Sequence, residues 1–390
     1  MKEFAMNGTP VKMWANMCDA TAWQQISNLC SLPFVFRHLA LMPDLHGGKG
    51  MPIGTVLATK DVVIPNAVGV DIGCGMCAVK TNIKVETIEQ EVLRKKIMRG
   101  IRKQIPLGME HHKEAQEEKY MPANHDVDSM TIVKRQYVSA TKQAGTLGGG
   151  NHFIELQRDD EGWLWIMIHS GSRNLGKQVC DYYSRVAMIL NERYFSSVKP
   201  ELNLPFLPLK TKEFNEYWSE MQYCIDFGLC NRKLIMQRIE EVISDAIPNV
   251  EFEPMINIAH NYAAWETHFD EACIVHRKGA TSAKMSEIGI IPGSQGTSSY
   301  IVEGLGNPLS FMSCSHGAGR VMSRTEAVKS LNLAEEIQKL DEKGIVHAIR
   351  CQEDLEEASS AYKNIEKVIE QEADLVKIKT HLFPVAVIKG

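Results

Sequence analysis

The segment 68–76 places an acid and a thiol in a setting that is typical of metal-binding loops. Asp71 and Cys74 lie three residues apart, with glycines on both sides and an apolar run before them. A carboxylate offers a hard oxygen ligand and a thiolate a soft sulfur ligand, while small neighbours let an ion approach the backbone. The pattern therefore predicts that this loop contributes to a metal site.

Histidines elsewhere in the chain end apolar runs or stand beside Gly or Asn. Any one of them alone is more often a packing or surface residue, as we expect for His268, His276, His347 and His381. A catalytic metal site, however, takes ligands from several elements and keeps a position open. One thiolate can also bridge two ions. The candidate ligands for a two-metal site are Asp71, Cys74, His152, His169 and His260.

The segment CSHGAGR (314–320) could carry covalent chemistry. Its small residues leave the imidazole of His316 accessible to a phosphate, and Arg320 can neutralise the phosphate charge. An imidazole can act as a nucleophile and form a covalent intermediate. A tight turn without a chemical role would also be rich in small residues, so this motif alone leaves both interpretations open. The loop 292–299 (PGSQGTSS) offers further groups for phosphate or base contacts.

Three other patterns give weaker signals. Cys74 and Cys77 form a C-x-x-C pair, but no second pair follows at the spacing of a zinc ribbon. Residues 171–178 nearly match a phosphate-binding P-loop, yet Gln178 stands where a hydroxyl residue should hold Mg²⁺. The polar segment 109–130 is predicted to be a mobile surface excursion, because no glycine frame holds its charged residues.

Composition limits the possible classes of protein. A chain of 390 residues with 44% hydrophobic residues can bury a large core. The net charge of -5 argues against a uniformly basic surface, although 43 Lys and Arg residues could still form a local basic groove. The first residues lack the apolar core of a signal peptide, and no apolar run approaches the roughly 20 residues of a membrane helix. The cytoplasm is the expected location, with the ten cysteines kept reduced.

The hydrophobic pattern predicts the elements that position these residues. Two strands within 52–80 lead to the loop of Asp71 and Cys74, and a strand at 163–168 ends beside His169. Apolar residues at helical spacing predict helices over 86–105, 174–194, 213–247, 324–342 and 352–373. Further strands are expected within 272–291 and over 381–387. Strands and helices intermix along the chain, so we expect one α+β domain over 1–390, with a variable surface excursion at about 106–140 and a helical insertion at about 200–250.

Several long motifs together resemble the RtcB family of RNA-splicing ligases. They are MPDLHGGKG (42–50), VGVDIGCGM (68–76), GTLGGGNHFIE (145–155), HSGSR (169–173), RKGA (277–280), IIPGS (290–294) and SHGAGRVMSR (315–324). The match runs from about Val11 to Gly390. It implies a composite RtcB-like domain with central mixed β-sheets, flanking helices and a dinuclear metal site. It also implies a GTP- and Mn²⁺-dependent enzyme of RNA splicing or repair, which joins RNA 2′,3′-cyclic-phosphate or 3′-phosphate ends to 5′-hydroxyl ends.

The resemblance also implies roles for individual residues. Cys74 would bridge two manganese ions, with Asp71, His152, His169 and His260 completing the site. His316 would carry GMP covalently and pass it to the RNA 3′-phosphate, after which the 5′-hydroxyl displaces GMP. Glu155 would accept hydrogen bonds from N1 and N2 of guanine. The residues implied around the nucleotide are Asn151, His152, Phe153, Ile154, Glu155, His260, Asn261, Pro292, Gly293, Ser294, Gln295, Ser299, His316, Gly317, Ala318, Gly319 and Lys389.

The chemistry of the substrate agrees with this hypothesis. A 3′-phosphate is a poor electrophile until guanylation supplies a good leaving group, and two cations offset phosphate charge. Mixed oxygen, nitrogen and sulfur ligation suits Mn²⁺, although zinc would bind at least as tightly. Lys49, Arg173 and Lys278 are candidates for contacts with RNA phosphates; ordinary solvated charge is the alternative.

Two other classes of function remain open at this point. A metal-dependent RNA phosphodiesterase or cyclic-phosphate hydrolase would use the same ions without a covalent guanylate. An RNA-end-binding protein with an inactive centre would need neither His316 nor Lys389.

Overall fold

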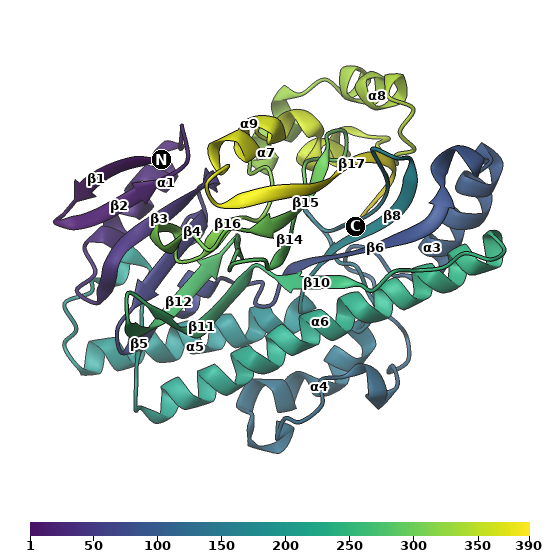
Figure 1. The fold of residues 1–390 in the computed structure, drawn as a ribbon. Coiled ribbons are helices and arrows are strands. Elements are labelled where there is room, and N and C mark those ends of the chain that lie inside the picture. Colours follow the sequence, from purple (N-terminus) through teal and green to yellow (C-terminus); the bar gives the residue numbers. More distant parts are fainter.

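Two large β-sheets form the centre of the structure, and helices cover them on both sides (Figure 1). This computed structural model describes residues 1–390. The first sheet has six strands. In spatial order they are β1 (Lys2–Met6), β2 (Thr9–Met13), β3 (Val35–His46), β4 (Ile53–Thr59), β12 (Glu271–Lys278) and β11 (Asn261–His268). The β2–β3 pair is parallel and the other pairs are antiparallel, so this sheet is mixed.

The second sheet has seven strands and is antiparallel throughout. Its order is β10 (Ile256–Ala259), β6 (Gly75–Lys84), β8 (Trp163–Ser170), β7 (Phe153–Asp159), β17 (Val376–Lys389), β15 (Ser299–Gly304) and β14 (Ile288–Ile291). Two short ribbons pair β13 (Ala280–Ser282) with β16 (Ser313–Ser315), and β5 (Val62–Val63) with β9 (Leu207–Pro208). The expectation of mixed sheets therefore holds for the first large sheet only.

Helices pack on both sides of the sheets. In Figure 1, α4, α5 and α6 lie below them, and α7, α8 and α9 lie above. The bounds are α1 (Ala20–Cys30), α2 (Pro65–Val68), α3 (Arg99–Gln104), α4 (Thr131–Gln143), α5 (Arg173–Arg193), α6 (Lys212–Ala246), α7 (Arg324–Ser330), α8 (Leu333–Glu342) and α9 (Ile365–Gln371). The longest, α6, begins where the Thr211 side chain accepts a hydrogen bond from the Phe214 N–H at 3.2 Å, an N-cap that satisfies one otherwise unpaired donor.

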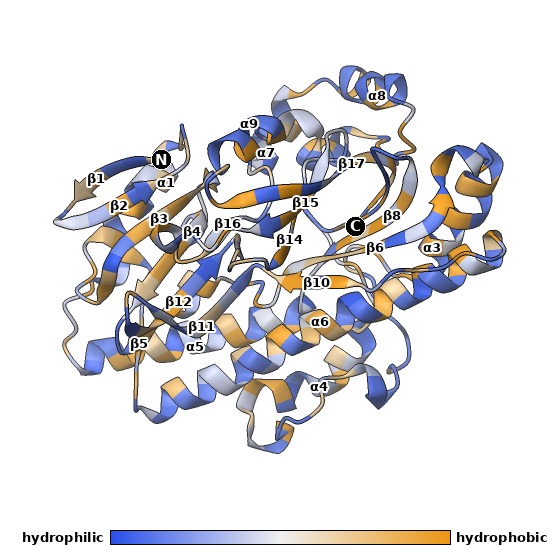
Figure 2. Cartoon of the chain, in the orientation of Figure 1, coloured by the Kyte–Doolittle hydropathy of each residue, from blue (hydrophilic) through white to orange (hydrophobic).

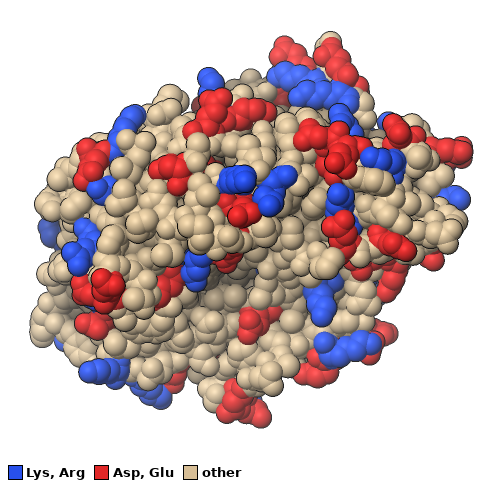
Figure 3. Space-filling view, viewed as in Figure 1, with Lys and Arg blue, Asp and Glu red and all other residues tan.

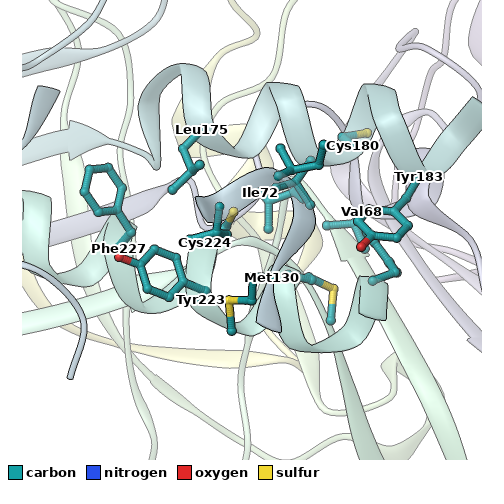
Figure 4. Packing of buried hydrophobic residues seen from close by; sticks show 14 of the residues in the cluster. Val68, Ile72, Met130, Leu175, Cys180, Tyr183, Tyr223, Cys224 and Phe227 are labelled. Atoms are coloured by element: carbon teal, nitrogen blue, oxygen red, sulfur yellow. The ribbon is translucent and has the colours of Figure 1, made fainter. Parts of the chain in front are cut away.

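The largest hydrophobic cluster anchors the predicted metal loop from below. Val68 and Ile72, which flank Asp71, are fully buried between α5 and α6. Figure 4 shows both side chains among Leu175, Cys180 and Phe227. Because fully burying such a side chain is worth about 1.5–3 kcal/mol, the two contacts hold the backbone of the loop firmly.

Hydrophobic residues concentrate on the central strands and on the helix faces turned toward them (Figure 2). No helix combines the length and the apolar character that spanning a bilayer requires. On the face of the molecule shown in Figure 3, Lys and Arg are interspersed with Asp and Glu. On this face, any basic groove for a polyanion must therefore be local.

Most of the predicted elements are present, and the differences have local causes. The helix expected over 324–342 is divided, because Asn332 caps a new helix by accepting hydrogen bonds from the backbone N–H groups of Ala334 and Glu335. The helix expected over 86–105 begins at Gln90, after a 3₁₀ turn over Val85–Thr87, and a π-helical segment (Val92–Met98) precedes α3. The prediction of a helix over 352–373 was wrong for the first half of that range. There two 3₁₀ turns flank an extended Ala358, and only α9 is α-helical.

Candidate active site

Four separate segments bring the five predicted metal ligands together. Asp71 and Cys74 lie in the turn between α2 and β6, His152 precedes β7, His169 lies near the end of β8, and His260 lies between β10 and β11. The turn depends on Gly73, whose φ is +72° and whose Cβ, if present, would lie 2.7 Å from the Cys224 backbone oxygen in α6.

The donor atoms form a continuous chain with the sulfur at its centre. Cys74 Sγ lies 3.4 Å from Nε2 of His152 and 3.2 Å from Nε2 of His169. His152 Nε2 is 3.1 Å from Oδ2 of Asp71, and His169 Nε2 is 3.3 Å from Nε2 of His260. The thiol thus has an oxygen and a nitrogen donor on one side and two nitrogen donors on the other.

The hydrogen bonds of the histidine rings direct their lone pairs into this cluster. Nδ1 of His152 lies 2.9 Å from the Leu147 backbone oxygen, and Nδ1 of His169 lies 3.1 Å from that of Asn151. A carbonyl oxygen can only accept, so each Nδ1 carries a proton, and Nε2 is the ring atom that faces the cluster and can bind a metal ion. Backbone partners of this kind are typical of metal-ligating histidines.

The protonation of the cluster also fits a bound cation. Burial, together with the neighbouring histidines, lowers the pKa values of His169 and His260 well below the usual range, so both rings are neutral. Their two Nε2 atoms face each other and need a shared proton or a cation between them. Burial and the negative charge of Asp71 raise the pKa of the Cys74 thiol, and only a nearby positive charge would favour its thiolate.

His316 lies directly beside this cluster. It follows β16, its ring centroid is 4.8 Å from that of His260, and its side chain is 14% exposed. The backbone N–H and Nδ1 of His316 both donate to Oδ2 of Asp44, at 3.0 and 2.5 Å. In the neutral ring, Nε2 of His316 therefore carries the lone pair and is the only ring atom that can act as a nucleophile.

Asp44, which the sequence analysis did not single out, controls the orientation of His316. It lies on β3 and is fully buried. Burial alone would raise the pKa of its carboxyl group, but the electrostatic interaction and the hydrogen bond with His316 hold that pKa below the usual value, so the carboxylate is ionised. A Cβ on Gly319 would lie 2.2 Å from the Asp44 backbone oxygen, which explains the glycine there. An acid beside the glycine-rich segment 47–50 was the signal that could have identified Asp44.

Arg232 is a second residue that the sequence analysis missed. It is fully buried in α6, and its Nη1 donates to the backbone oxygens of Gly73 at 3.0 Å and Ser170 at 2.8 Å. It thereby fixes the loop before Cys74 and the strand end after His169. A charged residue in the apolar stripe of a helix was the available sequence signal.

A cavity of about 800 Å³ opens onto His169 and His316. The predicted nucleotide-binding residues that line it are Asn151, Phe153, Glu155, Pro292, Gly293, Ser294, Gln295, His316, Gly317, Ala318, Gly319 and Lys389. Four others have supporting positions around it: His152, His260, Asn261 and Ser299. Asn261 donates to the Asp71 backbone oxygen, and the Ser299 hydroxyl accepts from the Gly293 N–H.

Ile154 points away from the cavity, because successive side chains of a strand alternate between its faces. Phe153 and Glu155 face the cavity, whereas Ile154 is buried in a hydrophobic cluster on the other side of the sheet. Its side chain therefore supports the pocket from behind and offers only backbone groups near a nucleotide.

Glu155 is a fully buried acid at the end of the cavity. Burial raises its pKa to about 8, although a hydrogen bond from Gln157 and the charge of Lys389 act in the opposite direction. The carboxyl group is thus largely protonated when no partner is bound. Gln295 behaves differently, since its amide donates to the Glu357 backbone oxygen at 2.8 Å and holds the 292–299 loop in place.

The three candidates for RNA contacts occupy different environments. Lys49 is exposed, and Arg173 begins α5 beside the metal loop. Lys278 is buried, and its ammonium group donates to the backbone oxygens of Lys49 and Asn66 at 2.5 and 3.1 Å. This placement does not support a direct contact of Lys278 with RNA. Arg320 also differs from expectation, because its guanidinium group binds the buried Glu357 carboxylate at 3.0 Å.

The weaker sequence patterns have structural explanations. Cys77 is buried in the hydrophobic cluster behind β6, away from the group that Cys74 forms with His152 and His169. The near-match to a P-loop does connect a strand to a helix, but a Cβ on Gly171 would lie 2.5 Å from Oδ1 of Asp71. That loop therefore packs closely against the metal loop.

Comparison with known proteins shows which family this chain resembles. Residues 25–390 match the family model described as tRNA-splicing ligase RtcB. The chain belongs to the RtcB family. Over 98% of its length it is 37% identical to the RNA-splicing ligase RtcB of Escherichia coli (strain K12), of which 97% is covered.

More distant members of the RtcB family match along most of the chain as well. The tRNA-splicing ligase RtcB of Nanoarchaeum equitans (strain Kin4-M) is 32% identical, with 100% of this chain and 97% of the relative covered. The RNA-splicing ligase RtcB homolog 1 of Entamoeba dispar (strain ATCC PRA-260 / SAW760) is 33% identical, with 94% and 81% covered. The family predicted from the motifs is thus confirmed.

Proposed function

We propose that this chain, an RNA ligase by its family, joins RNA ends with a 2′,3′-cyclic phosphate or 3′-phosphate to ends with a 5′-hydroxyl, using GTP. The names of its relatives support RNA ligation. The observation that carries the proposed route is the position of His316. Its Nδ1 is bound to Asp44, its ring lies beside the donor cluster, and it lines a cavity large enough for a nucleotide.

Asp71, Cys74, His152, His169 and His260 would hold two manganese ions, with Cys74 as the bridge. The central position of the Cys74 sulfur supports this assignment. Bound there, the ions would supply positive charge for phosphate oxygens. Every donor type present is compatible with Mn²⁺.

His316 and Asp44 would carry out the first chemical step. Nε2 of His316 attacks the α-phosphorus of GTP, and pyrophosphate leaves with the electron pair of the broken P–O bond. The ring then bears a positive charge, which the Asp44 carboxylate stabilises through the 2.5 Å contact with Nδ1. An oxygen of the RNA 3′-phosphate next displaces His316 from the guanylate, and the 5′-hydroxyl finally attacks the activated 3′-phosphate and releases GMP. A cyclic phosphate must first be opened by water.

Residues around the cavity would select guanosine. Glu155 accepts hydrogen bonds from N1 and N2 of guanine in its ionised form, a pattern that adenine does not offer. Lys389, near Glu155 and directed at the Asn151 backbone oxygen, would favour that ionised form. Lys49 and Arg173 would contact RNA phosphates; Lys49 is exposed, and Arg173 begins α5 beside the metal loop.

We place the activity in one domain that spans 1–390 and in the cytoplasm. All ten cysteines are unpaired, as expected in a reducing compartment.

Protein guanylation tests the proposal directly. We expect radiolabel from α-labelled GTP to become attached to the protein in the presence of Mn²⁺. His316→Ala should abolish this label, and His111→Ala, which changes an exposed histidine outside the cavity, should retain it. A phosphodiesterase would instead open cyclic phosphates without any protein-linked label, and an RNA-end-binding protein would do neither.

A further inference from the structure

A second histidine, His46, faces the same cavity as His316 and has no part in the steps above. It is the last residue of β3, two residues after Asp44. Residues two apart on a strand point to the same face, and the side chain of Asp44 reaches His316. His46 accordingly lines the cavity together with His316.

The backbone of Asp44 fixes the tautomer of His46. Nδ1 of His46 lies 2.8 Å from the Asp44 backbone oxygen, which can only accept, so Nδ1 carries the proton. Nε2 therefore presents a lone pair, and no protein group donates to it. One aspartate thus sets both rings, His316 through its carboxylate and His46 through its carbonyl. Burial lowers the pKa of His46 to about 4, so the ring is neutral near pH 7.

The part of the cavity around His46 contains none of the residues assigned to the nucleotide. We name it the His46 wall; it consists of Met17, Cys18, Asp19, Thr21, His46, Gly47 and Gly48. Asp19 holds the wall together, since its carboxylate accepts hydrogen bonds from the N–H groups of Gly47 and Ala22, both at 2.8 Å. The nucleotide residues of β7 and β17 belong to the other large sheet.

Two sides of one cavity therefore come from different sheets, with His316 contributing to the same lining. A ligase must hold two RNA ends at once, and the end that carries the activated phosphate has to lie close to His316. The His46 wall lines the same cavity as His316 and contains no nucleotide residue, so the other end can lie against it.

We propose that the His46 wall receives the 5′-hydroxyl end and that Nε2 of His46 accepts its proton during sealing. This inference rests on the proposed function. The hydroxyl O–H bond breaks and its proton moves to Nε2, while the oxygen forms a new bond to the 3′-phosphate. The bond from that phosphorus to GMP breaks, and GMP leaves with the electron pair. His46 later returns the proton to water.

Separating the guanylation and sealing steps tests this assignment. In His46→Ala we expect labelling of His316 by GTP to proceed, and sealing in a single turnover to slow by about 10²–10⁴-fold, the usual contribution of a general base. RNA with GMP on its 3′-phosphate should then accumulate. Added imidazole should accelerate sealing by His46→Ala, since the free base can enter the vacated space. His111→Ala serves as the control for an exposed histidine.

Three results would overturn the assignment of His46: wild-type sealing by His46→Ala, equal slowing of guanylation and sealing, or no acceleration by imidazole. Thermal unfolding of each variant shows whether it is folded. If His46→Ala is not folded, His46→Gln replaces it, because glutamine keeps most of the side-chain volume. A wild-type protein that takes no label would remove the proposed function and this inference together. If the wild-type protein is labelled and both His46→Ala and His46→Gln seal at the wild-type rate, only the role of His46 is refuted.

Discussion

Replacing Asp44 with asparagine tests how the structure activates His316. The change keeps the volume of a fully buried side chain but removes the charge that receives both the backbone N–H and Nδ1–H of His316. A hydrogen bond to a charged group contributes about 1.5–3 kcal/mol, which corresponds to roughly 10–150-fold in rate. If the amide NH₂ turns toward Nδ1, the ring must move its proton to Nε2 and loses its nucleophilic lone pair. The analogous change in the Ser-His-Asp triad costs about 10⁴ in kcat.

We therefore expect Asp44→Asn to slow guanylation by about 10²–10⁴-fold, measured as the rate at which radiolabel from GTP becomes protein-linked. Glu372→Gln is a matched control. Glu372 is also a fully buried carboxyl group, but it accepts its hydrogen bond, at 2.8 Å, from the backbone of Ser315 and makes none with the His316 ring. Guanylation by Asp44→Asn within threefold of the wild-type rate would refute the role of Asp44. So would equal slowing in both variants.

Three further predictions concern the metal cluster and the buried acids. Cys74→Ser should release both ions, because the sulfur is central among the donors. The metal content is measured after gel filtration. If two ions per chain are still found, the thiolate does not bridge them. Gly171→Ala places a Cβ 2.5 Å from Oδ1 of Asp71 and should therefore displace that ligand. We expect Mn²⁺ binding to weaken by at least about tenfold, or about 1.4 kcal/mol, in a titration followed by electron paramagnetic resonance. An unchanged affinity would show that Asp71 can move without a cost in binding free energy. Burial raises the pKa of Glu372 from 4.5 to about 8, so the folded state retains a proton that the unfolded state has lost, and stability falls as the pH rises between these values. Measured by urea unfolding, the free energy of unfolding should fall less steeply with pH in Glu372→Gln, by up to about 1.4 kcal/mol per pH unit. Glu155, whose pKa is also raised to about 8, should still contribute a similar pH dependence. An unchanged pH dependence would mean that Glu372 is ionised in the folded protein.

The sequence predicted best the features that depend on local patterns. The strand that ends at Ser170 and the helix over Arg173–Arg193 follow from short-range alternation and helical spacing, and both are present. The candidate ligands stand at strand ends or beside Gly or Asn, and the structure brings all five together. Motifs of this kind carry their signal within a few residues, so one sequence is enough to find them.

Contacts between distant segments could not be predicted in this way. Asp44 and His316 lie 272 residues apart, and no local pattern pairs them. The sequence also does not show in which direction a side chain points. Lys278 was expected at the surface, but its ammonium group is buried and donates hydrogen bonds to two backbone oxygens. Gln295 and Arg320 also turn toward backbone and carboxylate groups of the 352–357 turns, where a helix was expected.

The buried guanidinium of Arg232 has a consequence for the apo form of this ligase. It interacts electrostatically with both Cys74 and Asp71 while it holds the Gly73 and Ser170 backbones from the α6 side. This positive charge belongs to the protein itself. When a bound metal ion dissociates, the guanidinium group therefore still compensates part of the negative charge of the donor atoms. Binding and release of a metal ion at this centre can then be reversible local events, because the backbone on both sides of the donors stays fixed.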